Sequence, residues 1–261
     1  MNIEDVSTQL MYTTVPVYGI ASDKSISTGT GFVFSIQQNE QTSIPLLITN
    51  YHVVENAKEG FVELHISDNG FPTKDVARAY FNYDVIKEGK LGNLDLVVFP
   101  LAGAITDMQN KGITLFFKSI DISIFPTDKM IDEFAAVEDI TFIGYPNSIY
   151  DVENKIPIIR QGITATPIWN NFQGEEEFLI DAGVFQGSSG SPVFIYNRGT
   201  YPTKEGIAVG NRILFVGILS KTLQRKTDNV YLDLGVVINS RAFYREINNY
   251  IVKKTGHPIR K

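Results

Sequence analysis

Short runs of Val, Ile, Phe, Tyr and Thr recur along the whole chain, and Gly, Pro, Asn and Asp separate them. This pattern is typical of antiparallel β structure, because branched and aromatic side chains fit a pleated surface while the separating residues favour turns. With 261 residues, the chain has the size of one large all-β domain or of two tightly packed halves. The predicted strands cover residues 31–36, 45–49, 61–66, 94–101, 139–143, 156–161, 178–180, 191–196, 213–219 and 232–238.

Two regions depart from the strand pattern. Near the C-terminus, residues 240–253 place Phe243, Ile247 and Ile251 at a helical spacing, which predicts an amphipathic helix. Between about residues 106 and 138 the strand signal weakens, so we expect the connection between two halves there. The chain is thus predicted to be a single domain of three parts: an N-terminal half (1–115), a C-terminal half (130–240) and the final helix.

The composition excludes several classes of function. A formal net charge of -6 argues against nucleic-acid binding, which depends mostly on a basic surface. The chain contains no cysteine, so disulfides, thiolate nucleophiles and cysteine-ligated zinc sites are ruled out. Only three histidines are present, which leaves little for metal binding. We therefore expect neither a metal nor another cofactor.

The N-terminal residues do not look like a secretion signal. Acidic residues, Glu4 and Asp5, stand where a signal peptide has basic ones, and the apolar stretches that follow are short. No run of about 18 or more apolar residues occurs, so no membrane-spanning helix is expected. These features favour a cytoplasmic protein.

Three segments carry the residue types that serine-based hydrolysis needs, namely a hydroxyl, a base, a carboxylate and backbone donors. In GSSGSPVF, residues 187–194, two glycines flank a pair of serines and let backbone N–H groups approach a substrate closely. In LLITNYHVVENA, residues 46–57, His52 follows an apolar strand. In NLDLVVFPL, residues 93–101, Asp95 stands at the head of another apolar strand, where its half-buried carboxylate needs a partner.

Each segment taken alone also has a purely structural interpretation. A Gly-Ser-Ser-Gly turn is usually only a loop, a strand-end Asp is often a cap, and a single His is often a satisfied structural residue. Their joint occurrence favours catalysis. Asp84 and Asp107 are the alternative acids, but neither begins an apolar strand. The GTG sequence at residues 29–31 is part of a dinucleotide fingerprint, yet a strand follows it instead of a helix, so nucleotide binding is disfavoured.

The three segments resemble the signature blocks of the chymotrypsin/trypsin-like serine peptidases, especially the bacterial branch related to the HtrA proteases. TNYHVV resembles the histidine block, LDLVVFPL the aspartate block and GSSGSP the block of the nucleophile, in the family's chain order. The resemblance implies an all-β fold of two antiparallel six-stranded barrels with a C-terminal helix. It also implies a catalytic triad of His52, Asp95 and Ser189, with Ser189 preferred to Ser188 as nucleophile.

The family's other site residues fall on neighbouring positions. The oxyanion hole becomes the backbone N–H groups of Gly187 and Ser189. GILSKT resembles the strand that pairs with the substrate backbone, and its Ser220 stands at the position that contacts the catalytic Asp. In the segment before the oxyanion loop, Gly183, Val184 and Phe185 give no acid to hold a Lys or Arg side chain, so a small or medium apolar residue is expected before the scissile bond. The implied substrate-binding residues are Gly183, Val184, Phe185, Ser220, Lys221 and Thr222.

Two residues depart from the family pattern. Tyr51 stands before the histidine, where a small residue is usual, and Ser191 replaces a glycine after the nucleophile. The expected function is a serine endopeptidase that forms an acyl-enzyme on Ser189, and the alternative is a catalytically silent module that binds peptides. The expected partners are a protein or peptide substrate and, as for stand-alone bacterial relatives, one dedicated partner protein. The sequence indicates no oligomeric state.

Overall fold

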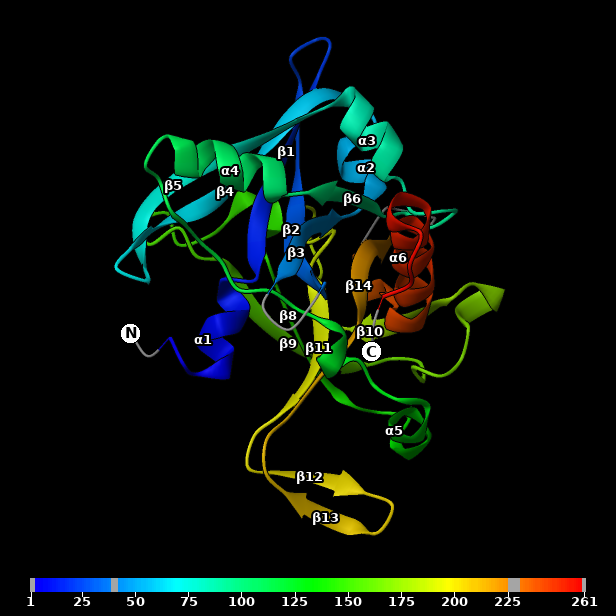
Figure 1. Ribbon diagram of the computed structural model, residues 1–261. Helices are drawn as coiled ribbons and strands as arrows, with labels where there is room; N and C mark the ends of the chain where they lie inside the picture. Colours follow the sequence, from blue (N-terminus) through cyan, green and yellow to red (C-terminus); the bar gives the residue numbers. More distant parts are fainter. Residues whose placement is uncertain (1–2, 39–41, 225–230, 260–261) are drawn as a thin grey trace.

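The computed structural model describes residues 3–38, 42–224 and 231–259, and Figure 1 shows its two β halves one above the other. The first half is a seven-stranded antiparallel sheet in the order β5-β4-β1-β2-β3-β6, with β7 paired to β4. Its strands are β1 (Thr14–Ala21), β2 (Ile26–Gln37), β3 (Ser43–Thr49), β4 (Ala57–Asp68), β5 (Phe71–Asn82), β6 (Val97–Pro100) and β7 (Leu115–Phe116).

The first half does not close into a barrel within the described part of the chain. Each strand pairs with its neighbour in the sheet order from β5 to β6, but no ladder joins these two outer strands to each other. Helix α3 (Tyr83–Gly89) lies at this gap and contacts both strands. Gly89 packs against β6 so closely that a Cβ there would lie 2.0 Å from the carbonyl oxygen of Val98. The predicted closure of the first barrel is thus not shown, and a helix occupies the place of the missing ladder.

The second half is a closed antiparallel barrel of six strands, in the order β10-β15-β14-β11-β8-β9. Strand β9 pairs with both β8 and β10, which completes the ring. This half agrees with the predicted six-stranded barrel. Its strands are β8 (Asp139–Gly144), β9 (Ile158–Thr164), β10 (Glu177–Asp181), β11 (Pro192–Asn197), β14 (Arg212–Gln224) and β15 (Tyr231–Asn239).

Aromatic side chains join the two halves through helix α6 (Ser240–Thr255). The ring of Phe32 on β2 lies 5.6 Å from that of Phe215 on β14, and both rings also contact Phe243 of α6. All three side chains are completely buried. The Asn239 side chain accepts a hydrogen bond from the first turn, which fixes where α6 begins. The predicted C-terminal helix is therefore confirmed, and it packs against a core shared by the two halves.

All ten predicted strands overlap observed ones, but several short elements were not predicted. The other helices have nine residues or fewer, too few for a clear helical period. The strands missing from the prediction are β1, β5, β7 and the hairpin of β12 (Thr200–Thr203) and β13 (Gly206–Val209). The further helices are α1 (Val6–Met11), α2 (Tyr51–Val54), α4 (Ala102–Asn110) and α5 (Asp128–Glu133), and the 3-10 turns are Ile122–Ile124, Pro146–Ser148 and Phe172–Gly174.

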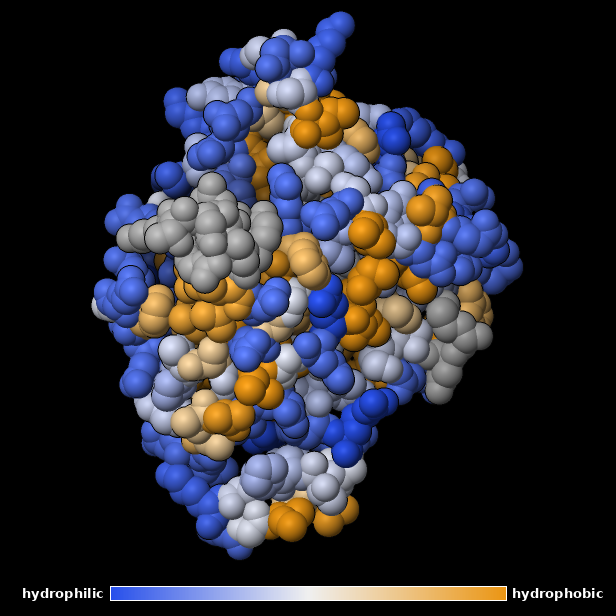
Figure 2. Space-filling view, turned by 180° about the vertical axis from the view of Figure 1, so that it is seen from behind, coloured by the Kyte–Doolittle hydropathy of each residue, from blue (hydrophilic) through white to orange (hydrophobic). Residues whose placement is uncertain are grey.

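The β12–β13 hairpin extends away from the second barrel, at the lower end of Figure 1. Apolar surface is visible on the same lower end from behind (Figure 2), where the side chains of Ile207 and Val209 are 77% and 88% exposed. Among the described residues, no helix is both long and apolar enough to cross a membrane.

Candidate active site

A pocket of about 330 Å³ lies between the two halves and brings most of the predicted site residues together. His52 comes from the first half, and Ser189 comes from the loop before β11 in the second. Strand β14 forms the opposite wall. The residues that line the pocket are His52, Val184, Phe185, Gln186, Ser189, Leu219, Ser220, Lys221 and Thr222.

His52 and Asp95 form a close pair. The Nδ1 atom of His52 lies 2.6 Å from Oδ2 of Asp95, and the backbone N–H of His52 donates to Oδ1 of the same carboxylate at 2.9 Å. Ser220 also donates its hydroxyl to Oδ2 at 2.9 Å. With Nδ1 donating to the carboxylate, Nε2 is left as the basic nitrogen of the ring. The imidazole is therefore held in the tautomer that a general base requires.

The backbone around the pair explains why His52 lies there. Asn50 ends strand β3 and is fully buried, and its side-chain amide donates to the backbone carbonyl of Asp95 at 2.8 Å. The next residue, Tyr51, donates its backbone N–H to the same carbonyl at 3.2 Å. These bonds tie the start of α2 to the segment before β6. His52 and Asp95 are thus fixed through their main chains as well as their side chains.

The environment of Asp95 keeps its carboxyl group ionised. Burial raises the pKa of Asp95, but the hydrogen bonds and charge of His52 and the hydroxyl of Ser220 lower it by more. The net pKa is below the ordinary value for an aspartate. The carboxylate can consequently orient the imidazole and stabilise its protonated form.

The hydroxyl of Ser189 points to a different partner. Its Oγ donates to the backbone carbonyl of Ser220 at 2.8 Å, and no hydrogen bond to His52 is formed among the described residues. Ser220 therefore contacts the serine through its carbonyl and Asp95 through its hydroxyl. A rotation about the Cα–Cβ bond of Ser189 would release the hydroxyl from this carbonyl.

Two glycines give the loop around Ser189 its shape. Gly187 and Gly190 have φ of +87° and +91°, in the left-handed region that side chains other than glycine rarely adopt. A Cβ on Gly190 would lie 1.9 Å from the carbonyl oxygen of Thr30, and one on Gly187 would lie 2.6 Å from that of Tyr145. Within the described residues, the backbone N–H groups of Gly187 and Ser189 have no hydrogen-bond acceptor. Neither predicted oxyanion donor is therefore used in a hydrogen bond within the part of the chain that the structure describes.

Thr30 is a positioning residue that the sequence analysis did not assign. It is completely buried on β2, and its hydroxyl donates to the carbonyl of Gly187 at 2.9 Å. Its backbone N–H donates to the carbonyl of Ser189 at 2.8 Å. The first half thus orients the loop of the second half. The only sequence signal was its place in the GTG segment, between glycines that admit close backbone contact.

The two departures from the family pattern fit the structure locally. Ser191 is completely buried, and its hydroxyl has no hydrogen-bond partner among the described residues. Gly144 makes room for it, since a Cβ at Gly144 would lie 2.1 Å from the Ser191 hydroxyl. The ring of Tyr51 lies under the ammonium group of Lys90, 4.4 Å from the ring centre, and does not line the pocket.

The substrate-binding residues predicted from the resemblance lie on two walls. Val184 is buried and Phe185 is 37% exposed on one wall, whereas Gly183, the residue before them, does not line the pocket. Lys221 and Thr222 form the other wall on β14. Lys221 lies 3.7 Å from a carboxylate oxygen of Glu177. One cation that sequence reasoning missed, Arg160 of β9, stacks its guanidinium 4.9 Å from the centre of the Phe185 ring.

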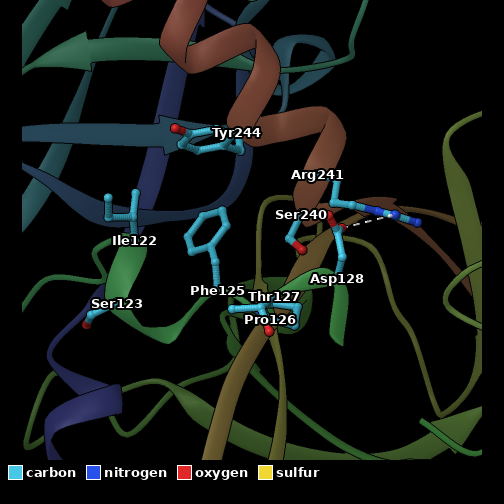
Figure 3. A pocket seen from close by; sticks show the side chains of 9 residues that line it. All are labelled: Ile122, Ser123, Phe125, Pro126, Thr127, Asp128, Ser240, Arg241 and Tyr244. Atoms are coloured by element: carbon cyan, nitrogen blue, oxygen red, sulfur yellow. Dashed lines mark ion pairs between the residues drawn. The ribbon is translucent and has the colours of Figure 1, made fainter. Parts of the chain in front are cut away.

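A larger cavity of about 520 Å³ opens on another part of the seam, beside the start of α6 (Figure 3). Phe125 and Tyr244 extend into it, and Asp128 and Arg241 form an ion pair at its edge. Its described lining offers hydroxyl groups but no imidazole to activate them. Nor could any group of three or more His, Asp or Glu side chains in the described ranges hold a metal ion. The 330 Å³ pocket is therefore the better candidate for catalysis.

A family model for the trypsin-like peptidase domain matches residues 29–200, a range that includes His52, Asp95 and Ser189. No curated protein matches the chain.

Three solved structures are similar in fold. A variant of the HtrA-type protease AlgW with a tripeptide superposes with a TM-score of 0.55 and 14% identity, covering 98% of this chain and 65% of that one. Deg5 gives 0.52 and 15%, covering 97% and 96%. The inactive form of Rv3671c from M. tuberculosis gives 0.50 and 14%, covering 97% and 91%. At these identities the similarity shows the fold alone.

Proposed function

Because the chain belongs to the trypsin-like peptidase domain family, we propose that it is a serine endopeptidase that cleaves peptide bonds through an acyl-enzyme on Ser189. One observation carries the proposal. His52, whose Nδ1 lies 2.6 Å from the Asp95 carboxylate, lines the same pocket as Ser189, and the backbone N–H groups of Gly187 and Ser189 have no acceptor among the described residues. This is the set of groups that acyl transfer to serine requires.

The first chemical step forms the acyl-enzyme. The Ser189 hydroxyl turns away from the Ser220 carbonyl and transfers its proton to Nε2 of His52 while Oγ attacks the substrate carbonyl carbon. The N–H groups of Gly187 and Ser189 donate to the oxyanion that develops. His52 then gives its proton to the amide nitrogen, the C–N bond breaks and the amine product leaves. Asp95 keeps the imidazole oriented and stabilises its charge throughout.

The second step restores the enzyme. A water molecule gives a proton to His52 and attacks the ester carbon, and the same two backbone donors hold the second oxyanion. When the intermediate collapses, the C–O bond to Ser189 breaks and His52 returns its proton to the serine. The products are an amine and a carboxylic acid, and no cofactor takes part.

Covalent labelling with a fluorophosphonate tests the proposal, with the neighbouring serine as a matched control. Ser188 is 1% exposed and its hydroxyl has no partner among the described residues. We expect the wild type and Ser188→Ala to gain one adduct by intact-protein mass spectrometry, and Ser189→Ala to gain none. An unlabelled wild type would refute the proposal and favour the silent peptide-binding module, whereas a labelled Ser189→Ala protein would show that another residue is the nucleophile.

A further inference from the structure

Arg160 projects toward the loop that precedes the oxyanion donors. On β9 the residues at 158, 160, 162 and 164 are less exposed than those at 159, 161 and 163, so Arg160 lies on the inward face. Gly162 on that face packs against the segment that follows β10, where a Cβ would lie 2.6 Å from the Cβ of Ala182. This face of β9 therefore supports the wall that contains Val184 and Phe185.

The guanidinium of Arg160 fills the space beside Gly183. A Cβ on Gly183 would lie 2.3 Å from Nη2 and 3.3 Å from Cζ of Arg160. On its other side the guanidinium stacks on Phe185, which lines the pocket together with Ser189. Gly183, which has no side chain, thus leaves room for a cation directly behind Phe185, a residue of the pocket wall.

Arg160 also lacks a carboxylate partner. In the described ranges no Asp or Glu oxygen lies within ion-pair distance of its guanidinium, although the side chain is half-buried. A partly desolvated guanidinium is stabilised by a planar acceptor that takes two of its N–H groups. Lys221 adds a second positive charge on the facing wall, and its ammonium lies 3.7 Å from a carboxylate oxygen of Glu177.

We propose that Arg160 makes the pocket selective for an acidic side chain, so that the substrates are peptides with Glu or Asp before the scissile bond. This inference rests on the proposed function and gives it a substrate class. The expected apolar preference follows from Gly183, Val184 and Phe185, which carry no charge, whereas the positive charge comes from Arg160 of β9. Lys221 is expected to contribute less, because it is 58% exposed and has a carboxylate nearby.

Matched peptide substrates test the proposal. Two peptides identical except for Glu or Gln before the scissile bond differ in charge but hardly in shape. We expect the wild type to cleave the Glu peptide with a kcat/KM about 10- to 100-fold higher, as for a charge-assisted hydrogen bond. In Arg160→Gln the ratio should fall to about one, while Arg160→Lys should retain part of it. The control Arg198→Gln removes an arginine whose nearest ring is Tyr196, outside the pocket, and should keep the full ratio.

A binding measurement separates failure of this inference from failure of the proposed function. The same two peptides, carrying a fluorophore, are titrated with Ser189→Ala and with the Ser189→Ala, Arg160→Gln double variant. Tighter binding of the Glu peptide that disappears in the double variant supports the inference, even if the wild type cleaves nothing. Equal binding of both peptides, or a Glu preference that persists without Arg160, overturns it, even if the wild type is labelled at Ser189.

Discussion

The two halves of the molecule differ in whether their catalytic groups are already arranged for reaction. The first half supplies a base that is already assembled, because His52 and Asp95 are joined by two hydrogen bonds, and the Asn50 side chain and the Tyr51 backbone N–H donate two more to the backbone carbonyl of Asp95. The second half supplies open backbone donors and a serine whose hydroxyl rests on the carbonyl of Ser220. The His52 base is thus already in position, whereas the Ser189 nucleophile needs one side-chain rotation to reach it.

Ser220 contacts both the base and the nucleophile. Its hydroxyl donates to Asp95, the partner of His52. Its carbonyl accepts the hydrogen bond from Ser189. A substrate backbone that donates to this carbonyl, as the resemblance of β14 to the family's substrate-pairing strand implies, would compete with Ser189 for it. We therefore expect substrate binding itself to free the nucleophile.

The substitution with the largest predicted effect disrupts the fixed geometry of the His52–Asp95 pair. Asp95→Asn should lower kcat by about 10⁴-fold, because the amide no longer holds the imidazole in the required tautomer. Asp107→Asn changes an acid on the exposed face of α4 and should leave kcat unchanged. Steady-state kinetics with one peptide substrate measures both. A loss of less than about tenfold in Asp95→Asn would show that the pair does not act as the base.

A second substitution disturbs the loop that holds Ser189 in the second half. Gly190→Ala should lower the free energy of unfolding by about 2–4 kcal/mol, from backbone strain together with the clash against Thr30. Gly70 is a matched control, because it has a similar φ of +83° but nothing within 4 Å of a Cβ. Gly70→Ala should cost only about 1 kcal/mol. Equal losses in urea unfolding would mean that Gly190 is required for its conformation alone.

Ser220→Ala sharpens the comparison, because it removes the hydroxyl bonded to Asp95 but leaves the carbonyl bonded to Ser189. The loss of one hydrogen bond to a charged group should lower kcat/KM by about tenfold. Ser188→Ala again serves as the control. If Ser220→Ala has no effect on kcat/KM, then the two bonds to His52 are sufficient to hold the Asp95 carboxylate.

The smallest effect concerns the pH dependence of stability. The pKa of Asp95 is lower in the folded state than its ordinary value, so its contribution is fully present above the unfolded pKa of about 3.9 and is lost as the pH falls through the folded pKa. The difference in unfolding free energy between the wild type and Asp95→Asn should therefore decrease below about pH 4. Urea titrations from pH 2.5 to about 6 measure it. A difference that grows on acidification would contradict the lowered pKa.

Strands with an unbroken apolar run were easier to predict from the sequence than strands whose apolar pattern is interrupted or alternates with polar residues. Strand β3 contains the unbroken run Leu46, Leu47 and Ile48, all buried, and was found. Strand β1 was missed because Pro16 and Gly19 interrupt its apolar pattern. Strand β5 was missed because it lies at the sheet edge and alternates exposed polar residues with buried ones. The unclosed first half could not be foreseen, since it depends on where α3 packs.

For the candidate site, the motifs predicted which residues lie together but not the side-chain conformation of the nucleophile. Glycine-rich and strand-end motifs marked Ser189, His52 and Asp95, because those residue types recur in fixed local contexts. The partner of the Ser189 hydroxyl depends on a side-chain torsion, which no motif encodes. Arg160 lies in a strand without a motif, and only tertiary packing brings it beside Gly183. Its contribution to selectivity could therefore not be inferred from the segment before the oxyanion loop.

The most direct test of this account is a crystal structure of the protein after reaction with a peptidyl phosphonate. We expect phosphorus bonded to Oγ of Ser189, with that hydroxyl oxygen no longer on the Ser220 carbonyl. A phosphonyl oxygen should accept from the N–H groups of Gly187 and Ser189, while the His52–Asp95 pair stays unchanged. A protein that forms no adduct, or an adduct on any other residue, would contradict the proposed catalytic site.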